Sequence, residues 1–352
     1  MKKILSFNLV LALAMMGAIS PPPAWSAPGV GVYLPITAPS ALLIDAETHK
    51  VIYAKSPHSR RTPASTTKLL TALVILKNVP LDATVRIPSW VDGIEPSKAH
   101  LRPGEHYRVR DLLHATLISS ANDAAEVLAV STAGSRAQFA SWMNAKARAL
   151  GCRNTHFTNA SGLPLGRQYS TAYDLALIMN QAEENAFIVD SLSRRHHTIS
   201  SLEGRPILLR NHNRLLWKTH NAVIGKTGWT RKGRHCFVGR INWRGRDVLV
   251  SLMGSHRLWQ DLNILVNYQF GLSIFKIRKN KKIWSSSQIK EIQKALARAG
   301  YSAGDRDGVF GPQTVRAVEG FQKSHGLRSD GVVGPQTCRK LKRYGLPQSY
   351  CR

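Results

Sequence analysis

Acidic residues are scarce in this chain of 352 residues. Asp and Glu number 21 against 49 Lys and Arg, so the formal charge is +28. So large an excess indicates a polyanionic setting, such as nucleic acid, an acidic membrane face or an acidic cell-wall polymer. Disorder is excluded, because 43% hydrophobic and 20% charged residues are typical of a folded protein. At roughly 150 residues per domain, the length predicts two domains.

Cysteine is rare, and the usual metal-binding spacings are missing. The four cysteines form no C-x-x-C pair, and the thirteen histidines form no H-E-x-x-H pattern, so we expect neither a metal site nor a cofactor. The pair His196-His197 is predicted to lie in a surface loop. Cys236 follows the pattern of a buried apolar residue. Cys338 and Cys351 are close enough in sequence to form a disulfide, although the four cysteines, Cys152 included, allow three pairings.

Long apolar runs are confined to the N-terminus. Two lysines precede an apolar run from Ile4 to Ile19, which is followed by prolines and small residues up to Ala27. This order is typical of a secretory signal peptide over residues 1–27. The run is shorter than the ~20 residues that span a bilayer, although an uncleaved anchor is the alternative. We therefore expect an exported protein, periplasmic or cell-wall associated, with no transmembrane segment in its mature chain and no nucleic-acid partner.

Charge density divides the rest of the chain into two modules. Residues 276–352 hold 17 basic and 5 acidic residues, a much denser positive charge than in the part before them. The basic, serine-rich segment 276–287 is typical of a linker. It separates a large module, residues 28–275, from a tail, residues 288–352.

The tail contains an internal repeat. The sequence D-G-V-F-G-P-Q-T of residues 307–314 returns as D-G-V-V-G-P-Q-T at residues 330–337. Asp-Gly favours a turn with positive φ, and proline after glycine favours the first turn of a helix. Three short helices around one small core are predicted. The repeat resembles the peptidoglycan-binding domain family, and a generic basic three-helix bundle is the alternative.

One motif in the large module is chemically suggestive. Ser65 and Lys68 begin the apolar helical run 69–76, and their spacing places them on one face, one turn apart. Free N–H groups in a first helical turn favour developing negative charge. A buried lysine with a lowered pKa can take the proton of a serine hydroxyl. The motif alone is weak, because Ser287 and Lys290 repeat it, and there we interpret Ser287 as a helix N-cap.

Two further motifs follow in order. Ser120-Ala-Asn122 comes after a predicted helix, and Lys226-Thr-Gly228 precedes a strand-like segment. The order S-x-x-K, S-x-N, K-T-G resembles that of penicillin-recognising serine hydrolases, and most closely the low-molecular-mass D-alanyl-D-alanine carboxypeptidases of peptidase family S11. The resemblance covers residues 38–272. It also rests on these segments: A-L-L-I-D at 41–45, R-T-P-A-S at 61–65, S-A-N-D-A at 120–124 and G-K-T-G at 225–228.

The resemblance implies an α/β (α+β) fold of the β-lactamase-like type. An antiparallel sheet is flanked by helices, and the site lies between the sheet and an all-helical cluster. In such a site Ser65 attacks the carbonyl of the penultimate D-alanine, Lys68 takes its proton, and Ser120 passes a proton to the leaving amine. Further roles are implied for substrate-binding residues and for the two backbone N–H groups of the oxyanion hole. The substrate-binding residues are Asn122, Lys226, Thr227 and Gly228, and the oxyanion hole is formed by Ser65 and Trp229.

Peptidoglycan is the implied partner, through its stem peptide at the site and its polymer at the tail, and β-lactams are implied as covalent inhibitors. The sequence departs from the family pattern at Ser161, where histidine is usual, and in the very basic segment 231–235. Three alternatives are weighed against a carboxypeptidase. A D,D-endopeptidase would share the machinery, and a non-catalytic wall-binding protein would keep only the fold. A class A β-lactamase would need an E-x-x-L-N motif, which is missing between the second and third motifs.

Overall fold

The structure is a computed structural model. It describes residues 34–217, 223–243, 245–270, 284–308, 310, 312–329 and 331–351. The expected signal peptide, residues 1–27, lies outside the described residues, as does most of the expected linker. The two folded parts, 34–270 and 284–351, are described separately below.

A five-stranded antiparallel sheet forms the centre of the larger part. Its order is β2-β1-β9-β8-β7, so β7 is an edge strand. The bounds are β1 Ser40–Asp45, β2 Val51–Lys55, β7 Val223–Thr230, β8 Arg234–Trp243 and β9 Arg246–Ser255. Eight consecutive residues of β9 are buried, as expected of a central strand covered on both faces.

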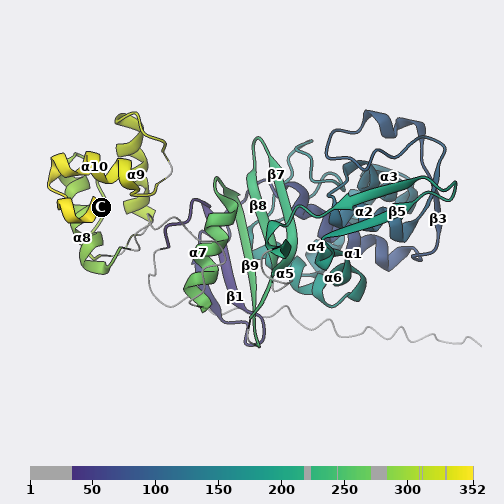
Figure 1. Cartoon of the computed structure of the whole chain (residues 1–352), viewed down its shortest axis with the longest axis horizontal. Helices are drawn as coiled ribbons and strands as arrows, with labels where there is room; N and C mark the ends of the chain where they lie inside the picture. The colour runs from purple at the N-terminus through teal and green to yellow at the C-terminus, as the bar shows by residue number, and fades with distance from the viewer. Residues whose placement is uncertain are drawn as a thin grey trace, which may run out of the picture.

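Helices cover both faces of this sheet (Figure 1). Helix α7, Leu258–Phe270, packs Leu262 and Leu265 against one face. Helix α5, Ala172–Glu183, lies on the opposite face, against β8 and β9. Beyond it lies an all-helical cluster of α1 Lys68–Asn78, α2 Val109–Ile118, α3 Asn122–Ala133, α4 Arg136–Ala149 and α6 Ala186–Ser193. The predicted α/β fold, with its antiparallel sheet and separate helical cluster, is confirmed.

Short elements connect these layers. Two small hairpins pair β3 Thr84–Arg86 with β4 His106–Arg108, and β5 His196–Ser200 with β6 Pro206–Arg210. The 3-10 turns are η1 Ala64–Thr67, η2 Ser89–Gly93 and η3 Arg214–Trp217. The expectation that His196 and His197 lie in a loop is wrong. They begin β5, and the ring of His197 packs against that of His114 on α2, with 4.4 Å between the ring centroids.

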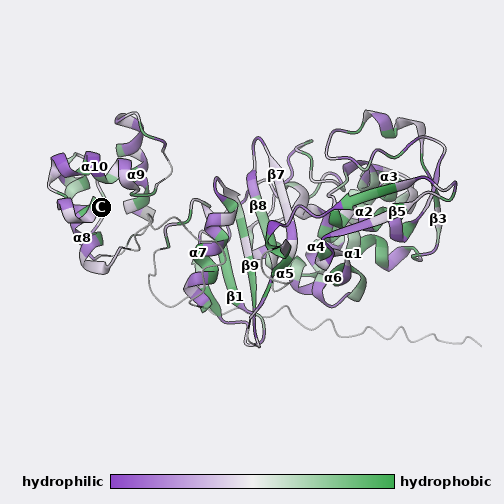
Figure 2. Ribbon diagram, in the orientation of Figure 1, coloured by the Kyte–Doolittle hydropathy of each residue, from purple (hydrophilic) through white to green (hydrophobic). Residues whose placement is uncertain are grey.

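The tail is a small helical unit with a core of its own. Its elements are α8 Ser286–Arg298, α9 Pro312–Ser324, α10 Pro335–Leu341, η4 Lys342–Tyr344 and η5 Gln348–Cys351. Apolar side chains of the helices form this core, and hydrophilic residues make up much of the remaining helix ribbon in Figure 2. The expected helix N-cap at Ser287 is wrong. Ser285 caps α8 instead, and Gln288 closes a capping box with it, because the helix begins two residues earlier than an N-cap at Ser287 would place it.

Two buried glutamines explain the repeat in the tail. Gln293 Nε2 donates to Asp307 Oδ1 over 3.0 Å, and its Oε1 accepts from the Gly308 N–H. Gln322 serves the second copy, where its Oε1 accepts from Gly331 N and its Nε2 donates to Thr337 Oγ1. Each turn is thus held by one side-chain amide from a neighbouring helix.

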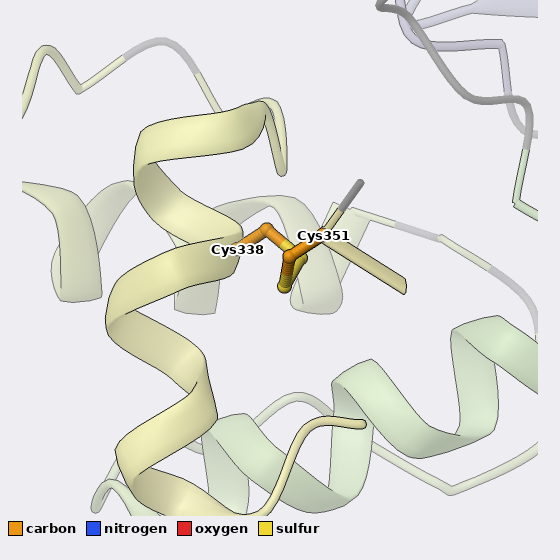
Figure 3. The surroundings of a disulfide bond; sticks show 2 residues. All are labelled: Cys338 and Cys351. Atoms are coloured by element: carbon orange, nitrogen blue, oxygen red, sulfur yellow. A yellow bond between two sulfur atoms is a disulfide. The ribbon is translucent and has the colours of Figure 1, made fainter. Parts of the chain in front are cut away.

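A disulfide closes the end of the tail. Cys338 in α10 is bonded to Cys351, with 5.4 Å between their Cα atoms (Figure 3). The expected bridge is confirmed. Cys152 and Cys236 are free and buried, as expected for Cys236. No helix among the described residues is both long and apolar enough to cross a bilayer.

Candidate active site

Ser65 lies in a 3-10 turn that continues directly into α1. The predicted first helical turn is therefore present but tighter than an α-turn. Thr66 and Thr67 fix it, because their hydroxyls donate to the carbonyls of Pro63 and Ala64 over 2.7 and 2.8 Å. These two side-chain hydrogen bonds hold the Ser65 turn in its 3-10 geometry.

Lys68 is completely buried at the start of α1. Its Nζ lies 3.1 Å from Ser65 Oγ, 2.6 Å from Asn122 Oδ1 and 2.5 Å from the Ser161 carbonyl oxygen. Burial, reinforced by the charge of Lys226, holds the Lys68 pKa well below its ordinary value, although nearby Glu126 opposes the shift. A neutral amine has two N–H donors and one lone pair. Donating to Asn122 and Ser161 leaves the lone pair for the hydroxyl of Ser65.

Ser120 and Lys226 form a second hydroxyl–amine pair. Lys226 Nζ donates to Ser120 Oγ over 2.9 Å and to the Thr227 carbonyl oxygen over 3.1 Å. Ser120 joins α2 to α3 with φ at +61°, which is uncommon for a residue with a side chain. Burial lowers the pKa of Lys226 to about 7.

Asn122 is held by the protein at both ends of its carboxamide. Its Oδ1 accepts from Lys68, and its Nδ2 donates to the Glu95 carbonyl oxygen over 3.0 Å. In the structure it orients Lys68. Its expected contact with substrate stays a prediction.

Glycines bring the third motif against the first. A Cβ on Gly228 would lie 2.8 Å from the Ser65 nitrogen, and one on Gly162, where φ is +81°, would lie 2.0 Å from the Ala64 carbonyl oxygen. Both glycines therefore permit close approach to the Ser65 turn. The sequence analysis missed this reason for Gly228. Strand β7 brings Thr227 and Trp229 to the same edge, and the Trp229 side chain is 58% exposed.

Several residues of the site have no motif that could have revealed them. Glu126 is buried on α3, and its Oε1 accepts from the N–H of Ser161, the residue whose carbonyl contacts Lys68. Asn213 holds the start of β7 through the Val223 carbonyl. Part of the His212 ring faces solvent, yet desolvation and the charges of Lys226 and Lys68 lower its pKa to about 4.

All three motifs thus meet in one site between β7 and the helical cluster. Its parts are a hydroxyl beside an amine of lowered pKa, a second hydroxyl, and an ammonium beside an edge strand. This set is suited to acyl transfer through a serine ester. No group of metal-binding side chains occurs among the described residues.

Comparison with known proteins identifies the family. Residues 26–257 match the family model described as D-alanyl-D-alanine carboxypeptidase of peptidase family S11. The chain belongs to this family. The serine-type D-Ala-D-Ala peptidase class expected from the motifs is thereby confirmed. Residues 285–341 match a peptidoglycan-binding domain family, which confirms the expected nature of the tail.

The sequence left a carboxypeptidase and an endopeptidase open, and similar proteins named for each of these activities are found. The D-alanyl-D-alanine carboxypeptidase DacF of Bacillus subtilis is 34% identical over 205 residues, covering 56% of this chain and 52% of DacF. The D-alanyl-D-alanine endopeptidase of Pseudomonas aeruginosa is 34% identical over 241 residues, covering 67% of this chain and 76% of that protein. The chain thus spans about half the length of DacF and three quarters of that endopeptidase.

A solved structure supports the fold. That of a D-alanyl-D-alanine carboxypeptidase from Mycobacterium tuberculosis superposes with a TM-score of 0.65 at 32% identity. The alignment covers 70% of this chain and 96% of that one. The shared part is the catalytic module, and the two family matches together indicate peptidoglycan as the material on which the protein acts.

Proposed function

We propose that the protein removes the terminal D-alanine from peptidoglycan stem peptides through an acyl-enzyme at Ser65. The observation that carries the proposal is the 3.1 Å contact between Ser65 Oγ and the buried Nζ of Lys68. Lys68 accepts the hydroxyl proton as Ser65 attacks the carbonyl of the penultimate D-alanine. The terminal D-alanine then leaves, and water hydrolyses the ester.

The second pair handles the leaving group and the carboxylate. Ser120 passes a proton to the departing amine, and Lys226 with Thr227 binds the free carboxyl end of the peptide. The backbone N–H groups of Ser65 and Trp229 stabilise the oxyanion. Gly228 supports this assignment, because its close approach to Ser65 places the β7 backbone beside the nucleophile.

Asn122 has two tasks in this proposal. It orients Lys68 through its Oδ1 and contacts the substrate's peptide amide after a small rearrangement of its carboxamide. β-Lactams imitate the D-Ala-D-Ala end, so they acylate Ser65 and remain bound.

The same proposal includes domain boundaries and location. The catalytic module covers residues 28–275, the linker 276–287 and the wall-binding tail 288–352. A signal peptide over residues 1–27 exports the protein to the periplasm or cell wall. The basic tail then holds the enzyme on its polymeric substrate.

Product analysis tests the carboxypeptidase activity. The enzyme is incubated with a pentapeptide monomer ending in D-Ala-D-Ala and, separately, with a crosslinked dimer whose stems have no terminal D-Ala-D-Ala. Release of D-alanine from the monomer and an intact dimer are expected. Cleavage of the dimer with little D-alanine release would favour the endopeptidase, the second candidate, which the Pseudomonas relative supports. If neither peptide is cleaved, wall binding without catalysis would be the remaining function.

A further inference from the structure

The wall of the site that contains β7 lacks acidic residues. From Gly204 to Arg246 the chain has 43 residues with 11 Lys and Arg and no Asp or Glu. Two of these cations are paired with acids from outside the segment, Arg205 with Glu105 and Arg240 with Asp247. The segment therefore carries a strong excess of positive charge in sequence.

Three of those cations gather where β7 turns into β8. Arg231, Lys232 and Arg234 are all exposed. Arg234 pairs with Thr230 through its backbone, but within the described part of the chain none of the three side chains has a hydrogen bond or ion pair. At the base of this tip, desolvation and the charges of Arg214 and His256 lower the pKa of His235, so the surroundings are also positive.

The tip has a fixed position next to the nucleophile. Thr230 Oγ1 accepts from the Gly233 N–H over 2.8 Å, which closes the turn. A Cβ on Gly233 would lie 3.1 Å from the Thr62 carbonyl oxygen, so the turn packs onto the segment that leads to Ser65. The backbone that presents the three cations is thus fixed, although their side chains are free.

Strand direction decides which part of a substrate meets the tip. Lys226 and Thr227 bind the carboxyl end in the proposed function, and Gly228 lies opposite Ser65. A peptide lying along β7 advances ~3.3 Å per residue. Its residues on the amino side of the scissile bond therefore pass Trp229 and reach the tip within two or three positions.

We propose that Arg231, Lys232 and Arg234 form an anionic-substrate subsite, which selects stem peptides bearing a free carboxylate in the two or three residues before D-Ala-D-Ala. The subsite rests on the proposed function, because it needs the carboxyl end bound at Lys226. It specifies the substrate further: acidic stems are preferred to stems in which the same group is an amide. Exposed ion pairs are individually weak, so the preference comes from several charges acting together.

Two peptides differing in one group test the subsite. We compare acetyl-Ala-Glu-D-Ala-D-Ala with acetyl-Ala-Gln-D-Ala-D-Ala and measure D-alanine release as kcat/KM. The wild type is expected to prefer the glutamyl peptide about fivefold, the effect of one or two exposed ion pairs. The preference should shrink as salt is raised. In the triple variant R231Q/K232Q/R234Q the ratio should approach one, and a ratio is unaffected by the amount of folded enzyme.

A matched variant separates local from general charge effects. K77Q/R86Q/R148Q removes three exposed cations that lie outside the site and outside residues 204–246. It should keep the wild-type preference. An equal loss of preference in both triple variants would overturn the subsite, because the effect would then come from net charge.

Fluorescent penicillin labelling of the wild type distinguishes failure of the subsite from failure of the proposed carboxypeptidase function. Labelling and D-alanine release without preference for the glutamyl peptide would overturn the subsite and leave the carboxypeptidase standing. Neither labelling nor release would overturn both.

Discussion

Two buried lysines define the site at the scale of single residues. Among the residues that the structure describes, Lys68 hydrogen-bonds to a hydroxyl, an amide oxygen and a backbone carbonyl, Lys226 to a hydroxyl and a carbonyl, and neither to a carboxylate. Burial disfavours an ammonium, so both pKa values lie below the ordinary range. One lysine must be neutral to act as a base, whereas the other must be charged to bind a carboxylate.

The need for a charged Lys226 predicts how kcat/KM depends on pH. The pKa of Lys226 is about 7 in the free enzyme, so the kcat/KM for a D-Ala-D-Ala peptide should fall above pH 7, as Lys226 loses its proton. In Lys226→Arg the guanidinium stays charged. We expect lower activity in this variant but no descending limb near pH 7. An identical limb in both enzymes would assign it to another group.

That the three motifs meet could be predicted from the sequence, because their residues belong to patterns with fixed spacing. Ser65 and Lys68 meet as the i, i+3 rule requires. Glu126 and the Ser161 carbonyl could not be found in this way. Glu126 accepts from the backbone N–H of Ser161, and Lys68 donates to the carbonyl of the same residue. Neither contact requires a particular side chain at position 161, so no sequence motif marks it.

At the scale of secondary-structure elements, the site depends on the fit of β7 against the Ser65 turn. The missing side chain of Gly228 permits that fit, because there is no room for a Cβ at this position. From the sequence, the family resemblance implied only that Gly228 binds substrate. It could not show that the glycine also faces the nucleophile's own backbone, because that contact joins residues 163 positions apart.

Gly228→Ala tests this contact. The added methyl would lie 2.8 Å from the Ser65 nitrogen, so β7 must move away from η1. Overpacking of this kind costs roughly 1–3 kcal/mol, and we expect acylation by a fluorescent penicillin to slow by about tenfold or more.

Gly93→Ala is the matched control. Nothing lies within 4 Å of a Cβ built there, so its acylation rate should equal that of the wild type. Unchanged acylation in Gly228→Ala would show that the close approach is unimportant for reactivity.

The tail shows a different limit of sequence reasoning. Its two D-G-x-x-G-P-Q-T copies were enough to predict the turns and the helices after them. The buried amides of Gln293 and Gln322 that hold the turns were not predicted, because they lie at different distances from their copies. The helix start was misplaced at Ser287, since Ser285 and Ser287 are chemically equivalent as caps and only the contact with Gln288 decides between them.

At the scale of the whole molecule, one chain combines a module of the peptidase family with a basic domain of the peptidoglycan-binding family. Residues 276–352 have a net charge of +12. Attraction between exposed charges is screened within about 10 Å at 0.1 M salt, so a purely electrostatic tether weakens as salt rises.

Sacculus binding tests the tether. We expect the full chain to sediment with purified sacculi at low salt far more than a chain ending at residue 270. This retention should fall steeply between about 50 mM and 0.5 M salt. Retention that persists at high salt would indicate a specific glycan or peptide pocket in the tail. Equal retention of both chains would show that the tail is not the tether.

The central claim is that Ser65 is the nucleophile activated by Lys68. Its most direct measurement is mass spectrometry of the peptide that carries a bound penicillin. We predict a penicilloyl adduct on Ser65 in the wild type and in Ser287→Ala, whose serine belongs to the second S-x-x-K. We predict no adduct in Ser65→Ala and strongly slowed labelling in Lys68→Ala. An adduct on another serine, or undiminished labelling of Ser65→Ala, would contradict the account.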